Sequence, residues 1–100
     1  MNYRFHINRG ATKDLNEISA WYEEQETGLS EQFEKALRDC FAKILLDPLW
    51  PRFHTNREVR RWRMLNWPYS IFYRMRGDQV RIVAIIHTSR DPKYLNYRLR

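Results

Sequence analysis

The chain has 100 residues, of which 43% are hydrophobic, and its formal net charge is +6. This length and composition fit one folded domain spanning residues 1–100 and exclude a disordered chain. No apolar run approaches the roughly 18 residues of a membrane span, the N-terminus lacks a signal-peptide pattern, and a single cysteine excludes an internal disulfide, so we expect a soluble cytoplasmic protein without membrane contact.

The first half of the chain predicts one strand and two helices. Residues 3–7 alternate apolar and polar side chains, as a half-buried strand does. Asn8 is a plausible N-cap for a helix that ends at Thr27-Gly28 and carries Trp21 on its apolar face. A second helix follows and stops at Asp47-Pro48. Two helices joined by so short a turn should pack as an antiparallel hairpin.

The second half predicts strands. Residues 48–57 are expected to form a loop, and alternating patterns then begin at Val59 and Tyr69. A third segment, residues 79–87, is rich in Ile and Val and is typical of a central strand. The tail from Ser89 predicts at most one short helical turn. The expected fold class is therefore α+β, in the order β-α-α-β-β-β.

The strand register can be predicted from the turn at Gly77-Asp78. If this is a two-residue hairpin loop, Arg74 faces Arg81 across the two strands. The more apolar face, which should lie on the helices, then carries Ile71, Tyr73, Ile82, Ala84 and Ile86. The opposite face carries Ser70, Phe72, Arg74, Arg81, Val83, Ile85 and His87. Arg61 and Arg63 join this second face if Trp62 and Met64 belong to the core.

Charge is distributed unevenly along the chain. Residues 1–50 hold six Lys/Arg and nine Asp/Glu, a net −3, whereas residues 51–100 hold twelve and three, a net +9. Eleven of these twelve cations are arginine, the planar bidentate partner of phosphate and carboxylate. Solubility and surface ion pairs are one explanation. An anionic partner is the second explanation, and the concentration of positive charge in one half of the chain favours it.

The candidate site residues form a basic and aromatic set. They are Arg61, Arg63, Arg74, Arg81, His87, Arg90 and Tyr94. Such groups suit metal-independent cleavage of RNA, which needs a base, an acid and cationic stabilisation of the phosphate. Local explanations stand beside this one: His87 bonded to the following turn, Arg90 paired with Asp91, and Tyr94 covering the sheet edge. Scattered histidines and the lack of a glycine-rich phosphate loop predict neither a metal nor a cofactor.

Several strings, in this order, resemble the RelE/ParE superfamily of bacterial toxins, which includes plasmid stabilisation proteins. The strings are Ala11-x-x-Asp14-Leu15-x-x-Ile18, Gly28-Leu29-x-x-x-Phe33, Arg60-Arg61-x-Arg63-Met64, Trp67-Pro68-Tyr69-x-Ile71-x-Tyr73, Val80-x-Ile82-x-Ala84-Ile85-x-His87 and Ser89-Arg90-Asp91-Pro92. The resemblance implies a helical hairpin packed on a twisted, mainly antiparallel sheet. It also implies growth inhibition and a disordered acidic antitoxin that folds over the toxin, the complex often repressing its own operator DNA.

The superfamily has two mechanisms. ParE-like members inhibit DNA gyrase, and the string from His87 to Pro92 favours this branch. RelE-like members cleave messenger RNA on the ribosome, and in that case Arg61, Arg81, His87 and Tyr94 would be catalytic. Under either mechanism, Arg63, Arg74 and Arg90 are expected to bind the anionic target. The chain lacks the lysine-rich segment that RelE itself uses. A nucleic-acid-binding module without toxicity is a further alternative.

Overall fold

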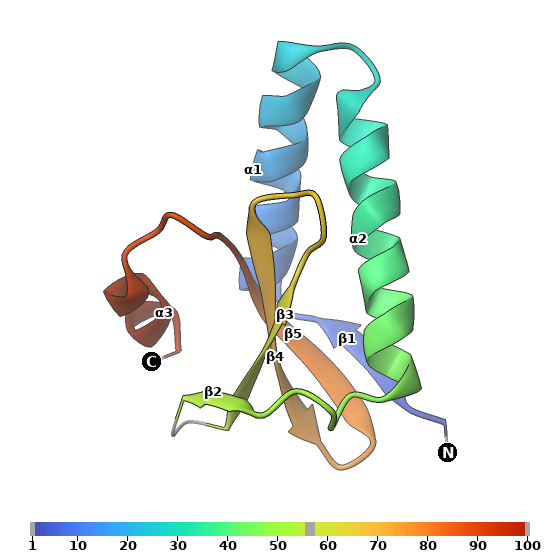
Figure 1. Cartoon of the computed structure of the whole chain (residues 1–100), viewed down its shortest axis with the longest axis vertical. Helices are drawn as coiled ribbons and strands as arrows, with labels where there is room; N and C mark the ends of the chain where they lie inside the picture. The colour runs from blue at the N-terminus through green and yellow to red at the C-terminus, as the bar shows by residue number, and fades with distance from the viewer. Residues whose placement is uncertain (1, 56–57, 100) are drawn as a thin grey trace.

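The computed structural model describes residues 2–55 and 58–99 (Figure 1). Its elements are β1 (Arg4–Ile7), α1 (Arg9–Gln25), α2 (Leu29–Leu46), β2 (Phe53–Thr55), β3 (Val59–Arg63), β4 (Tyr69–Arg76), β5 (Gln79–His87) and α3 (Pro92–Arg98). They form a five-stranded sheet of order β1-β5-β4-β3-β2. The β1–β5 pair is parallel and the other pairs are antiparallel, so the sheet is mixed. The predicted α+β class is confirmed.

The two long helices form the predicted hairpin (Figure 1). Side chains fix both the start of α1 and the turn between the two helices. Asn8 is the N-cap of α1, because its side-chain oxygen accepts the Ala11 N–H at 2.8 Å. Gly28 adopts φ 89°, a left-handed conformation that glycine takes without a Cβ clash. The Glu23 carboxylate accepts hydrogen bonds from the Ser30 hydroxyl and from the Gly28 and Ser30 amides, and these bonds lower the pKa of Glu23.

The hairpin of β4 and β5 has the predicted register at its turn. Gly77-Asp78 forms the loop, Arg76 is opposite Gln79, and Arg74 is opposite Arg81. Like charges directly opposite each other across two strands destabilise the pair. The predicted pairing of Arg74 with Arg81 is therefore confirmed, and it brings two cations together.

A β-bulge interrupts the same hairpin further along. Tyr73 pairs with Ile82, but the next residue back along β4, Phe72, pairs with Ala84, so Val83 is an extra residue on β5. A bulge of this kind leaves one residue without a partner and bends the strand. Because side chains alternate with a period of two, one extra residue moves every later side chain of β5 to the opposite face.

The bulge corrects one of the predicted faces. Ala84 and Ile86 were expected to lie on the helices, but they belong to a second core beneath α3. Ile85 was expected on the opposite face, but it is buried in the main core between the helices and the sheet. His87 follows on that side, with its ring 5.2 Å from the ring of Tyr69.

The two cores lie on the two faces of the sheet. The main core contains Phe33, Leu37 and Ile44 of α2 packed on sheet residues that include Tyr69, Ile71, Tyr73, Val80 and Ile82. The second core contains Leu95 and Leu99 packed on Val59, Phe72, Ala84 and Ile86. Burial of Leu95 and Leu99 contributes roughly 1.5–3 kcal/mol for each side chain, so α3 is an integral part of the fold.

Three further expectations need correction. The expected loop 48–57 contains the short strand β2, and residues 56 and 57 lie outside the described part of the chain. The tail forms a seven-residue helix rather than one turn, with Asp91 as its N-cap. Trp21, placed on the apolar face of α1, is 53% exposed. Among the described residues, no helix is long and apolar enough to cross a membrane.

Candidate functional site

Arginines from three strands lie on one face of the sheet, the face that α3 partly covers. Arg61 pairs with Phe72 and Arg63 pairs with Ser70 across β3 and β4, so both share a face with Arg74 and Arg81. Trp62 and Met64 pack in or against the main core on the other side. The predicted sharing of one face by Arg61, Arg63, Arg74 and Arg81 is therefore confirmed by the pairing of the strands.

This basic face extends over three neighbouring cross-strand rows. Arg81 lies between His6 of β1 and Arg74 of β4 in one cross-strand row. Arg61 and Arg63 belong to the rows of Phe72 and Ser70, further along the sheet. α3 packs Leu95 and Leu99 on the part of this face that holds Phe72, Ala84 and Ile86. Because Arg61 pairs with Phe72, which lies two residues from Arg74 on β4, the rows of Arg74 and Arg61 are neighbours on this face.

Some cations of the C-terminal half are engaged within the protein. Arg60 donates through Nη1 to the carbonyls of Leu49 and Pro51, and its guanidinium lies 4.5 Å from the ring centre of Phe53. Arg98 is paired with Asp14, which raises the pKa of the Arg98 guanidinium. These two arginines stabilise the structure and are not available to an anionic partner.

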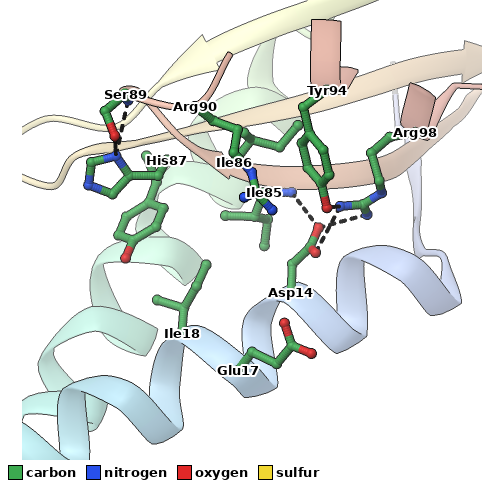
Figure 2. A pocket seen from close by; sticks show the side chains of 11 residues that line it. Asp14, Glu17, Ile18, Ile85, Ile86, His87, Ser89, Arg90, Tyr94 and Arg98 are labelled. Carbon is green, nitrogen blue, oxygen red and sulfur yellow. Dashed lines mark hydrogen bonds and ion pairs between the residues drawn. The ribbon is translucent and has the colours of Figure 1, made fainter. Parts of the chain in front are cut away.

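A cavity of about 280 Å³ lies between α1, the end of β5 and α3 (Figure 2). Three of the predicted site residues line it: His87, Arg90 and Tyr94. The Arg90 guanidinium lies 3.9 Å from the ring centre of Tyr94, a cation–π contact. Among the residues that the structure describes, no ion pair joins Arg90 to Asp91, whose carboxylate accepts the Lys93 N–H. The Tyr94 hydroxyl accepts a hydrogen bond from Arg98 at 3.1 Å, which lowers the pKa of Tyr94.

Two of the residues that line this cavity, Asp14 and Arg98, form an ion pair that the sequence did not predict. Arg98 and Asp14 meet through two hydrogen bonds of 2.8 and 2.9 Å, and Asp14 also accepts the Ile85 N–H at 2.9 Å (Figure 2). Strand β1 ends at Ile7, which lies opposite Ile82 of β5, so β1 offers no partner to the Ile85 amide further along β5. The Asp14 carboxylate accepts that amide hydrogen instead. The available signal was the position of Asp14, which falls between Ala11 and Ile18 on the apolar face of α1.

His87 is held by the turn that follows it. Its Nδ1 atom lies 3.0 Å from the Ser89 backbone nitrogen and 2.8 Å from the Ser89 hydroxyl (Figure 2). A backbone N–H can only donate, so Nδ1 accepts and the ring proton of the neutral imidazole sits on Nε2. His87 in this state is a hydrogen-bond donor to any ligand, and it lacks a free ring nitrogen to act as a base. The local explanation of His87 is therefore confirmed.

A second cavity, of about 210 Å³, lies on the other side of the chain segment that joins β5 to α3. Arg61, His54 and His87 line it together with Arg90. Arg61 is oriented by a 2.9 Å hydrogen bond from its Nε to the buried Ser70 hydroxyl. Burial and the positive charge of Arg61 lower the pKa of His54. The structure thus brings Arg61 to the same cavity as His87, while Arg81 and Arg74 lie elsewhere.

The chain matches the family model described as ParE toxin of type II toxin-antitoxin system, parDE, over residues 5–92. Among solved structures, it is similar to a chain from the chromosomal ParDE TA system from P. aeruginosa, with a TM-score of 0.67 and 22% sequence identity. That similarity covers 87% of this chain and 97% of the other. No curated protein sequence matches the chain. Because the family model spans nearly the whole fold described above, this protein belongs to the ParE family of toxins from type II toxin–antitoxin systems.

Proposed function

We propose that this ParE toxin stops growth by inhibiting DNA gyrase rather than by cutting RNA. The observation that carries this proposal is the separation of the groups that RNA cleavage would need. Arg81 lies in the row of His6 and Arg74, His87 uses its Nδ1 for Ser89, and the Tyr94 hydroxyl accepts from Arg98. A nuclease needs its base, acid and cationic group around one phosphate.

We also propose an acidic antitoxin as the partner that neutralises the toxin. A solved structure similar to this chain belongs to a ParDE TA system, and residues 51–100 of this chain carry a net charge of +9. A disordered acidic segment that folds on binding can cover such a surface with a favourable electrostatic contribution. The resulting complex would act on operator DNA through the antitoxin, and the toxin would work in the cytoplasm.

The test is an in vitro assay of gyrase supercoiling activity with purified toxin. We expect loss of supercoiling at stoichiometric or moderately higher toxin concentration, and restoration when the antitoxin is added. In cells, induction of the toxin alone should activate the DNA-damage response and leave messenger RNA intact. Full gyrase activity in the presence of folded toxin would contradict the proposal.

A second candidate function, ribosome-dependent cleavage of messenger RNA, is favoured by one observation. Arg61, His54, His87 and Arg90 line the same cavity of about 210 Å³. Arginine there could stabilise a phosphate and histidine could exchange a proton. This candidate predicts that Arg61→Ala and His87→Ala each abolish cleavage of ribosome-bound messenger RNA while the protein remains folded.

A further inference from the structure

The loop between α2 and β2 is held against the sheet from two sides. The Tyr73 hydroxyl donates to the Pro48 carbonyl at 2.8 Å, and Arg60 Nη1 donates to the carbonyls of Leu49 and Pro51. Pro48 and Pro51 are themselves buried. Three anchored carbonyls within four residues fix the loop backbone. Any side chain that points outward from this loop is therefore presented in a defined position.

Two large apolar side chains point outward from the fixed loop. Leu49 is 53% exposed and Trp50 is 73% exposed. Trp50 lies with its ring centre 6.2 Å from that of Trp62, in an edge-to-face arrangement. Single exposed apolar residues are ordinary, but a fixed cluster of them marks an interaction surface.

Two arginines complete this surface, which we call the Trp50 surface and define as Leu49, Trp50, Arg61, Trp62 and Arg63. Trp50, Arg61, Trp62 and Arg63 line an open cavity of about 490 Å³, and none of these lining residues is acidic. Within the described part of the chain, β2 pairs only with Val59 and Arg60, so no strand covers the outer edge of β3 alongside this cavity. The Trp50 surface is thus open, apolar at its centre and cationic at its margin.

The composition of the Trp50 surface identifies the kind of partner. Trp and Arg are the residues that most often dominate the binding energy of protein interfaces. Its two arginines require a partner with acidic groups. The exposed aliphatic Leu49 gains from burial against a protein and contributes nothing to stacking of nucleic-acid bases. An acidic polypeptide with a bulky apolar side chain therefore fits better than a nucleic acid.

We propose that the Trp50 surface docks an acidic segment of the antitoxin. An apolar antitoxin side chain seats against Trp50 and Trp62, and flanking carboxylates contact Arg61 and Arg63. This inference rests on the antitoxin partner proposed above. The antitoxin is chosen over the toxin's target because an apolar surface exposed in the free protein favours aggregation, and a neutralising partner would keep that surface covered.

The probe is the product of the reading frame beside the toxin gene, taken as the candidate antitoxin. The test measures its affinity for purified toxin variants by isothermal titration calorimetry. Trp50→Ala and Arg63→Gln should each weaken binding by about 30-fold, as hot-spot residues do. Trp21→Ala and Arg76→Gln are matched controls, because Trp21 is also exposed and Arg76 is an exposed strand arginine. These two should change the affinity by less than about threefold. Thermal melting of each variant confirms that it is folded.

Each alternative result has a definite meaning. If the wild-type toxin binds the antitoxin and both surface variants bind equally well, the docking inference is wrong and the proposed partner stands. If the surface variants bind the antitoxin normally but no longer inhibit gyrase, the surface contacts the target, and the inference is again overturned. If the wild-type toxin does not bind this antitoxin, the proposed partner fails, and the inference fails with it. Gyrase inhibition by the wild-type toxin is read separately and tests the proposed target alone.

Discussion

Asp14 of α1 and Arg98 of α3 form a bidentate ion pair that joins the first long helix to the last helix of the chain. The two Nη–Oδ distances are 2.8 and 2.9 Å, and the side chains are 13% and 15% exposed. Asp14 also satisfies the amide of Ile85, which follows the β-bulge. One carboxylate therefore positions α1, β5 and α3 together, in the lining of the cavity in Figure 2.

Replacing Asp14 by asparagine should destabilise the protein strongly. Asp14→Asn keeps the shape of the side chain but leaves the Arg98 charge nearly buried without a counter-ion, a loss of about 3 kcal/mol. Urea unfolding measures it. The control is Asp39→Asn, which removes the exposed Lys35–Asp39 pair and should cost less than about 0.5 kcal/mol. Equal losses in the two variants would show that the Asp14–Arg98 pair adds nothing beyond a surface contact.

The effect of a Gly10→Ala substitution on stability should depend on the same ion pair. Alanine is favoured over glycine within a helix by up to about 1 kcal/mol. At Gly10, however, a Cβ atom would lie 3.0 Å from Arg98 Nη2, which is already held by Asp14. We therefore expect Gly10→Ala to give no gain in the wild-type chain and a gain of about 0.5–1 kcal/mol in the Arg98→Ala background. A double-mutant cycle with no coupling would refute this close contact.

The buried tyrosines should make stability fall in alkaline solution. Burial raises the pKa of Tyr73 from 10.0 to about 12, and burial also raises the pKa of Tyr69. A raised pKa means that the folded protein keeps the proton longer than the unfolded chain does. The contribution of Tyr73 is therefore complete below pH 10 and is lost between pH 10 and about 12, by roughly 2–3 kcal/mol.

Alkaline unfolding followed by circular dichroism tests this pH dependence. Tyr73→Phe provides the comparison: it loses the hydrogen bond to Pro48, at a cost of about 1 kcal/mol at neutral pH, but its stability should decline less above pH 10. Tyr94 should ionise before Tyr73 in a spectroscopic titration, because its hydrogen bond from Arg98 lowers its pKa. Parallel alkaline declines in the wild type and Tyr73→Phe would argue against Tyr73 as the cause.

His87 should be dispensable for toxicity if the toxin is a gyrase inhibitor. Its Nδ1 accepts from Ser89, so NMR should find the neutral ring as the Nε2–H form. His87→Ala should leave growth inhibition on induction within about threefold of wild type, and His54→Ala, a matched change in the neighbouring cavity, should do the same. A folded His87→Ala variant that has lost toxicity would instead support RNA cleavage.

Local sequence rules predicted much of the fold, because their physical causes are local. The Asn8 cap, the glycine turn at Gly28 and the end of α2 before Pro48 each depend on a few neighbouring residues. The Gly77-Asp78 turn likewise sets the pairing of the strands close to it. The predicted position of Arg74 opposite Arg81 is therefore correct.

The features that the sequence did not predict depend on distant contacts. The bulge at Val83 turns the later side chains of β5 to the face opposite the predicted one. The amide of Ile85, just after the bulge, donates to Asp14, which is 71 residues away in the sequence. The Arg98 partner is likewise 84 residues distant. Of the candidate site, the sequence pattern predicted that Arg61, Arg63, Arg74 and Arg81 share one face. It could not show that α3 covers part of this face, and it left open whether His87 is bonded to its own turn.

The most direct test of the central claim is DNA supercoiling by purified gyrase titrated with this toxin, with ribosome-bound messenger RNA assayed in parallel. The account predicts that supercoiling falls as toxin is added, that antitoxin restores it, and that the RNA remains uncut. Unchanged supercoiling together with cleavage of the RNA by the same folded preparation would contradict it.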